Sequence, residues 1–186
     1  MKRVLTIAAG LMLSAGVVAQ HSIENPFFDQ VTYRGAFDAT TLWTDGWTSW
    51  NAENTVYPAT TVTKSGEITA SETWTSSNVY KIEGFLYVRS GATLTIEAGT
   101  IIRGDKASKG TLIIERGGKI NAVGTAVNPI VFTSNEAAGS RDYGDWGGII
   151  ICGKAAINVP GGEAQIEGGP TSYYGGGAAS DDADNS

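Results

Sequence analysis

Short stretches in which apolar and polar residues alternate recur between residues 79 and 168, and turns containing glycine separate them. Alternation with a period of two is typical of a β-strand with one buried face, because successive side chains point to opposite faces. No stretch repeats apolar residues at the 3.6-residue spacing of a long helix, whereas Thr, Val and Ile are frequent. The sequence therefore predicts an all-β fold.

The alternating pattern repeats along the chain. Residues 84–96 align with residues 110–122 after a shift of 26, and with residues 147–159 after a further 37. A second strand type follows each unit, at residues 99–102, 128–132 and, more weakly, 164–168. Three apolar columns coincide in the alignment, and we expect them to point inward: Leu86, Leu112 and Ile149; Val88, Ile114 and Ile151; Leu94, Ile120 and Ile157.

Repeated units of this length cannot bury an apolar face alone, but coils stacked about 4.8 Å apart close a continuous core. We therefore predict a parallel β-helix over residues 67–170, with residues 134–146 as a protruding loop that absorbs the longer second shift. Residues 20–66 are expected to form a linker and capping segment, and residues 171–186 a Gly/Asp-rich loop or tail that leads into further coils. The alternative is a β-sandwich, whose strands alternate without columns at a fixed offset.

The first 19 residues combine Lys2 and Arg3 with an apolar run that ends in small residues, which is the layout of a secretory signal peptide. Its removal changes the net charge from −6 to about −8, since two positive charges are lost. A chain this acidic is not expected to bind nucleic acid. No later run approaches the roughly 20 apolar residues of a membrane helix, so no membrane span is expected.

Three aromatic residues, Trp43, Trp47 and Trp50, lie close together ahead of the first coil. Aromatic rings stack on sugars, so these residues are a candidate glycan site. The favoured interpretation is a cap, because an open β-helix end exposes a sheet edge and core side chains.

Tyr87, Ile113 and Ile150 form an outward apolar column on three coils. An apolar strip of this kind is usually covered, either by another part of the chain or by a bound molecule. We expect the cover to come from the amino-terminal aromatic segment or from the loop 134–146. The alternative is a bound protein or glycan.

The tripeptide Arg103, Gly104 and Asp105 is one that some animal adhesion receptors bind. It lies between two expected strands, where a glycine with positive φ and an aspartate form a turn. We therefore expect a structural role for it.

The sequence contains one histidine, His21, which adjoins the expected cleavage site. A histidine-based triad or metal cluster in the coils is therefore not expected. Polysaccharide cleavage by paired carboxylates, or by Ca²⁺ with a basic residue, is the enzymatic alternative. Its candidates lie in the long loop, at Arg141, Asp142 and Asp145. Trp146 is expected instead to anchor the base of that loop.

Several runs of the sequence are distinctive in combination. They are LWTDGWTSWNAENTVYPATTVT, LTIEAGTIIRGDKASKGTLIIERGGKI, NPIVFTSNEAAGSRDYGDWGGIIICGKA and the acidic DDADNS. They resemble the amino-terminal part of large secreted proteins of Bacteroidota that are exported by type IX secretion and have no assigned activity. The resemblance implies a right-handed parallel β-helix and an extracellular location.

Taken together, these features favour a secreted or cell-surface β-helix of structural, adhesive or glycan-binding type. The expected partner is an extracellular polysaccharide or a cell-surface protein. A polysaccharide lyase or glycosidase is the alternative. No cofactor or metal is expected. Ca²⁺ is considered with the enzymatic alternative and at the acidic residues 180–186, which are expected instead to form a solvated tail.

Overall fold

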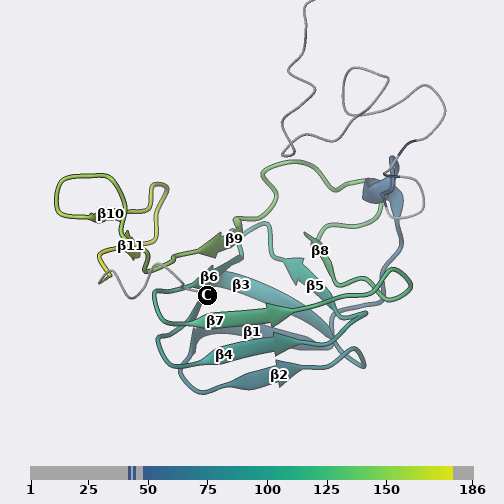
Figure 1. Ribbon diagram of the computed structural model, residues 1–186. Helices are drawn as coiled ribbons and strands as arrows, with labels where there is room; N and C mark the ends of the chain where they lie inside the picture. Colours follow the sequence, from purple (N-terminus) through teal and green to yellow (C-terminus); the bar gives the residue numbers. More distant parts are fainter. Residues whose placement is uncertain (1–41, 43, 45–47, 178–186) are drawn as a thin grey trace, which may run out of the picture. The chain divides into compact units, whose positions relative to one another are not determined.

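The structure is a computed structural model that describes residues 42, 44 and 48–177 (Figure 1). The expected signal peptide, Trp43 and Trp47 lie outside these residues. The chain divides into two compact units, residues 1–48 and 49–186, and every strand described belongs to the second unit. In the described ranges no helix is long and apolar enough to cross a membrane.

The regular elements of the described chain are short strands, apart from a single turn of 3₁₀-helix before them. In chain order the elements are η1 (Ala52–Asn54), β1 (Val62–Ile68), β2 (Glu72–Trp74), β3 (Val79–Val88), β4 (Thr93–Ile96), β5 (Ile101–Gly104), β6 (Thr111–Ile114), β7 (Lys119–Ala122), β8 (Val131–Ser134), β9 (Gly148–Ile151), β10 (Glu163–Gln165) and β11 (Tyr173–Gly175).

Two parallel sheets form the walls of the coil. Strands β2, β4 and β7 stack in one sheet, as Figure 1 shows, and β1, β3, β5, β6, β8 and β9 form the other. The long strand β3 pairs through its first half with β5 and through its second half with β6. The first three turns of the chain each add a layer to both sheets, and β8 and β9 add a fourth layer to the larger sheet. This is a parallel β-helix, as predicted.

The predicted register is confirmed. Leu86 pairs with Leu112 and Leu112 with Ile149, so the strands are parallel at the offsets of 26 and 37 residues read from the sequence. Leu94 pairs with Ile120 in the second sheet. The β-sandwich alternative is therefore wrong for this part of the chain.

The core lies between the two sheets. Leu86 and Leu112 are 1% and 0% exposed, and the rings of Trp74 and Tyr80 stack with their centroids 4.5 Å apart. Ile149 and Ile151 point the same way from β9 but are 40% and 55% exposed. Their exposure follows from their position, because β9 is an edge strand of the described sheet.

Two expectations for the last coil are wrong. Ile157 lies outside any strand, and the stretch expected as a third coil strand forms β10, which pairs antiparallel with β11. Gly168 and Gly169, with φ of 90° and 123°, lie in the connection between these two strands. Because glycine adopts positive φ at little cost, the chain reverses there as a hairpin instead of adding a parallel rung.

Successive coils differ in length mainly at the corner between the two halves of the large sheet, where the connection varies. This connection grows from a kink at Gly84 within β3 to residues 105–110 between β5 and β6, and then to residues 135–147 between β8 and β9. Asp105 N donates to Ile82 O at 2.9 Å and Asn135 N to Gly104 O at 2.8 Å, so successive connections begin one above another. The protruding loop was predicted at this position.

Candidate functional site

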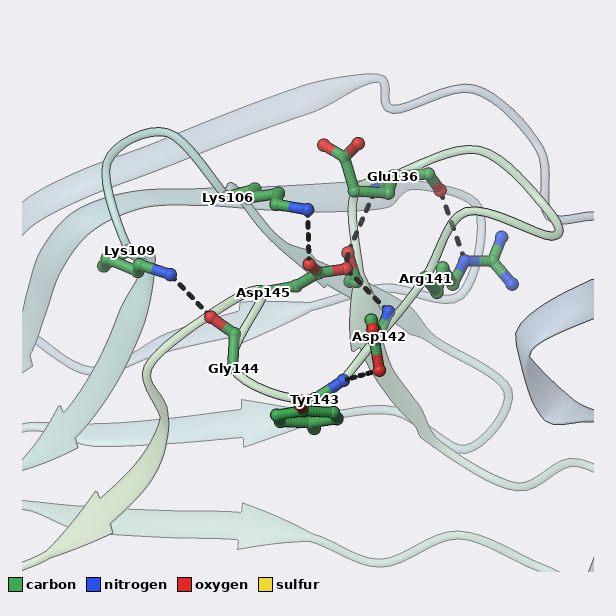
Figure 2. Close-up of polar contacts among 9 residues, drawn as sticks. Lys106, Lys109, Glu136, Arg141, Asp142, Tyr143, Gly144 and Asp145 are labelled. Atoms are coloured by element: carbon green, nitrogen blue, oxygen red, sulfur yellow. Dashed lines mark hydrogen bonds and ion pairs between the residues drawn. The ribbon is translucent and has the colours of Figure 1, made fainter.

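The loop 135–147 is tied to the coil beneath it by Asp145. The carboxylate accepts hydrogen bonds from Ser134 Oγ at 2.7 Å and Asp142 N at 3.0 Å, and it forms an ion pair with Lys106 Nζ at 2.8 Å (Figure 2). Its side chain is only 2% exposed. Lys109 adds a second tether by donating to Gly144 O at 2.6 Å.

These contacts determine the protonation of Asp145. The bond from Lys106, followed by those from Asp142 N and Ser134, lowers the pKa of the Asp145 carboxyl from 3.8 to about 2. Asp145 is therefore ionised at neutral pH, and its oxygens are engaged in holding the loop. This is a structural role, whereas a general acid needs a raised pKa.

Arg141 joins the loop to the segment that precedes the coils. Its guanidinium donates to Thr55 O at 2.7 Å and Glu53 O at 3.3 Å, and it lies 4.8 Å from the ring of Tyr57. Carbonyl groups at the end of η1 lack helical partners, so a guanidinium is well suited to them. Gly139 N also donates to Glu53 O, at 2.9 Å.

The contacts of Arg141 join the long loop, which carries Tyr143, to the segment that carries Trp50. Trp50 lies just ahead of η1 and is 87% exposed, and Tyr143 on the loop is 95% exposed. The Tyr143 ring points away from the Asp145 cluster, and Asp142 accepts the Tyr143 N–H at 2.8 Å (Figure 2). We call Trp50, Asp142 and Tyr143 the aromatic surface. Trp50 does not bury against the coils, so this residue is not part of a cap.

Tyr143 was not among the residues that the sequence singled out. The alternation pattern identifies residues in strands, whereas Tyr143 lies in a loop whose candidate residues were the charged ones. Its position as an aromatic residue in the long loop 135–147 is the feature that could have indicated it. Arg141, in turn, was expected as a partner of carboxylates, but its bonds here are to main-chain oxygens.

Trp146 anchors the base of the loop, as predicted. A Cβ atom added at Gly104 would lie 2.5 Å from Trp146 Cβ, so the indole packs directly against the glycine. The expected reason for this glycine was wrong: Gly104 lies within β5 and has no positive φ. It is needed for close approach instead.

The Arg103, Gly104, Asp105 tripeptide is built into the coil. Arg103 is 8% exposed and donates to Pro58 O at 3.2 Å, Asn135 O at 3.0 Å and Glu136 O at 3.1 Å. Burial, followed by the charge of Arg141, lowers the pKa of Arg103. Asp105 accepts both Ser108 N and Ser108 Oγ, which closes the expected turn. A receptor would find the arginine inaccessible.

The outward apolar strip is covered by the chain itself. Ile113 is 0% exposed, and Tyr87 and Ile150 are half-buried. The cover includes the segment after β10, because a Cβ at Gly169 would lie 3.4 Å from the ring of Phe85, and Ser172 Oγ donates to Glu115 at 2.9 Å. This segment was not the cover expected. The strip is therefore not a free binding face at Ile113.

Other reactive groups are engaged or buried. Cys152 is 0% exposed, and burial, followed by the charge of Glu115, raises the pKa of its thiol. A buried thiol of raised pKa is a poor nucleophile. Within residues 42, 44 and 48–177, no three His, Cys, Asp or Glu side chains are grouped to hold a metal ion.

Comparison with known proteins agrees with the fold. The family model described as pectate-lyase like beta helix domain matches residues 66–186. The chain therefore belongs to the family of pectate-lyase-like β-helix domains. Searches of curated proteins and of solved structures gave no match.

Proposed function

We propose that the chain is a secreted or cell-surface β-helix protein that binds extracellular glycan through the aromatic surface. The observation that carries the proposal is the exposure of Tyr143, at 95%, on a loop held by the buried Asp145 carboxylate and by main-chain contacts of Arg141. An exposed ring on a fixed support loses little entropy on binding and offers an apolar face to a sugar. Trp50, at 87% exposed, supplies a second ring on the segment that Arg141 ties to the loop.

Binding is favoured over cleavage by the state of the loop's charged groups. A pair of catalytic carboxylates needs one free acid and one free base or nucleophile on either side of the scissile bond. Asp145 is ionised and forms an ion pair with Lys106, and the guanidinium of Arg141 donates hydrogen bonds to carbonyl oxygens. Only Asp142 is exposed, and its carboxylate accepts a main-chain N–H. A lyase or glycosidase is the second candidate, because the family name includes pectate lyase.

The location and partners belong to the same proposal. The signal-peptide pattern of residues 1–19 and the resemblance to type IX secretion substrates of Bacteroidota support export. The net charge of −6 supports a polysaccharide or a cell-surface protein as partner over nucleic acid. Glycan stacking on aromatic rings requires no metal, so we propose binding without Ca²⁺.

The test is retention of the purified chain on a panel of insoluble plant and bacterial polysaccharides, followed by titration on those that retain it. Tyr143→Ala should weaken binding roughly two- to twelvefold, since a stacked ring contributes about 0.5–1.5 kcal/mol beyond buried area. Tyr143→Phe keeps the ring and should bind like the parent. Tyr174→Ala removes a ring that is 37% exposed in the hairpin and serves as a surface control.

Two results would contradict the proposal. Parent-like retention of the Tyr143→Ala, Trp50→Ala double variant would remove the aromatic surface from consideration. Release of reducing ends from any retained polysaccharide, abolished by Asp142→Asn, would establish the enzymatic alternative.

A further inference from the structure

A small cavity lies where the end of β6 meets the hairpin of β10 and β11. Its volume is about 220 Å³, and its lining consists of Glu115, Arg116, Thr171, Ser172 and Tyr173. This is below the roughly 300–1,000 Å³ of pockets that enclose drug-sized ligands. At about 30 Å³ per water molecule, it holds the equivalent of about seven waters, which suits one small polar ring.

The polar groups of the cavity are fixed by the chain. Arg116 forms an ion pair with Glu163 and donates to Gly175 O at 3.0 Å. Its guanidinium lies 6.0 Å from the centre of the Tyr173 ring. The Arg116 contacts therefore join the hairpin to the residue that follows β6.

Glu115, the second charged group, is held in the same way. One of its oxygens accepts Ser172 Oγ at 2.9 Å, and the other pairs with Arg89. Both charged lining residues thus keep their positions without a ligand, so the cavity is preorganised.

The charges of the cavity indicate what it would accept. The charges of the two charged lining residues, Glu115 and Arg116, sum to zero, and one guanidinium nitrogen, Arg116 Nη1, contacts both Glu163 and Gly175 O. An anionic ligand would have to compete with Glu163 for Arg116. The groups that remain available are the Thr171 hydroxyl, which is exposed, and the Tyr173 ring, which is 44% exposed. A hydroxyl and an aromatic face match an uncharged, hydroxyl-rich ring.

We propose that this cavity is a subsite for one neutral pyranose unit of the glycan, distinct from the aromatic surface. The inference rests on the proposed function, because it assumes a glycan ligand. The sugar stacks against Tyr173 and exchanges hydrogen bonds with Thr171. The carboxylates of Glu115 and Glu163 disfavour the negative charge of a uronic acid unit, so the ligand class is a neutral glycan.

The experiment is calorimetric titration of the purified chain with neutral β-1,4-linked hexasaccharides of glucose, mannose and xylose, and with hexagalacturonate as the anionic probe. At least one neutral hexasaccharide should bind, and hexagalacturonate should bind at least tenfold more weakly. Tyr173→Ala should weaken neutral binding about tenfold, which corresponds to about 1.4 kcal/mol.

Tyr174→Ala is the matched control. Tyr174 is the next residue of β11, is similarly exposed at 37%, and lies outside the cavity lining. Neighbouring strand residues point to opposite faces, so this variant should change the affinity less than twofold. Thr171 lies outside the strands, and Thr171→Val removes its hydroxyl while keeping a side chain of similar shape. This variant should also weaken binding severalfold. Thermal melting establishes that each variant is folded.

Each outcome separates this inference from the proposed function. Binding that Tyr143→Ala weakens but Tyr173→Ala and Thr171→Val leave unchanged would overturn the subsite and keep the aromatic surface. Binding that only Tyr173→Ala and Thr171→Val weaken would support the subsite and remove the aromatic surface. Tighter binding of hexagalacturonate would overturn the neutral class, and no binding of any probe would overturn the subsite.

Discussion

Ile114 and Ile151 allow the stacking of the coils to be tested with one substitution made twice. They occupy the same column on neighbouring rungs, because Ile114 of β6 pairs with Ile151 of β9. Ile114 is 0% exposed and Ile151 is 55% exposed. Residue type, strand position and neighbouring backbone are therefore matched, and burial is the main difference.

The expected costs of the two substitutions differ severalfold. Ile114→Ala removes a fully buried side chain and leaves a cavity, which costs about 2–5 kcal/mol. About 45% of Ile151 is buried, from the 55% that is exposed. Full burial of an Ile side chain is worth about 1.5–3 kcal/mol, so Ile151→Ala should cost about 0.7–1.4 kcal/mol. No closed cavity forms at an open edge, so no cavity penalty is added.

Urea unfolding followed by circular dichroism measures both values, with unchanged slopes as the check that the denatured states are alike. The unfolding free energy should fall by at least about 0.6 kcal/mol more for Ile114→Ala than for Ile151→Ala. Equal losses would refute the reasoning, because they would mean that Ile151 is as buried in solution as Ile114. Leu112→Ala and Ile149→Ala repeat the comparison in the neighbouring column, at 0% and 40% exposed.

Further substitutions test the corner of the coil. Gly104→Ala should destabilise by about 1–3 kcal/mol through overpacking against the indole, and Trp146→Leu in the same chain should recover part of this in thermal melting. Asp145→Asn should lose stability relative to the parent above about pH 4, and the gap should close as pH falls towards 2, because the folded pKa is about 2 against 3.8. Arg103→Lys should cost about 1–3 kcal/mol in urea unfolding, since a single ammonium cannot reach all three carbonyls. Attachment of animal cells should be the same for Asp105→Glu and the parent.

The parallel coil was predictable because its determinants are local and repeated. Side chains in stacked coils contact their equivalents one rung away, so the requirement for an apolar residue recurs at a fixed offset. Leu86, Leu112 and Ile149 satisfy it at the shifts of 26 and 37. Arg89 and Glu115, which form an ion pair, are separated by the same 26 residues.

The hairpin and its contacts were not predictable in this way. Strand β10 has the composition of a coil strand, but its partner is set by the reversal at Gly168 and Gly169. A glycine pair indicates a turn without fixing where the returning strand lies. The burial of Ile113 depends on that return, since the strip itself has the composition of an exposed binding face.

The candidate site was predicted as two unconnected parts. Sequence favours Trp50 as part of an aromatic cluster and Arg141 as part of a charged loop, and nothing in the spacing links them. Arg141 contacts the main-chain carbonyls of residues 53 and 55. Every residue has a main-chain carbonyl, whatever its type. Contacts between a side chain and a main-chain oxygen leave no pattern in residue types, so only the structure reveals them.

The position of the long loop suggests how a β-helix gains a binding surface without changing its core. The connection at the corner contains six residues between β5 and β6, from 111 − 104 − 1, and thirteen between β8 and β9, from 148 − 134 − 1. Both rungs nevertheless keep the same register in the strands on either side. Because insertions at this corner leave the inward columns unchanged, their cost is limited to loop closure, which grows only with the logarithm of length. Lys106 in the shorter connection holds Asp145 in the longer one, so one layer supports the next, and the exposed residues at the tip of the longer loop are free to serve binding.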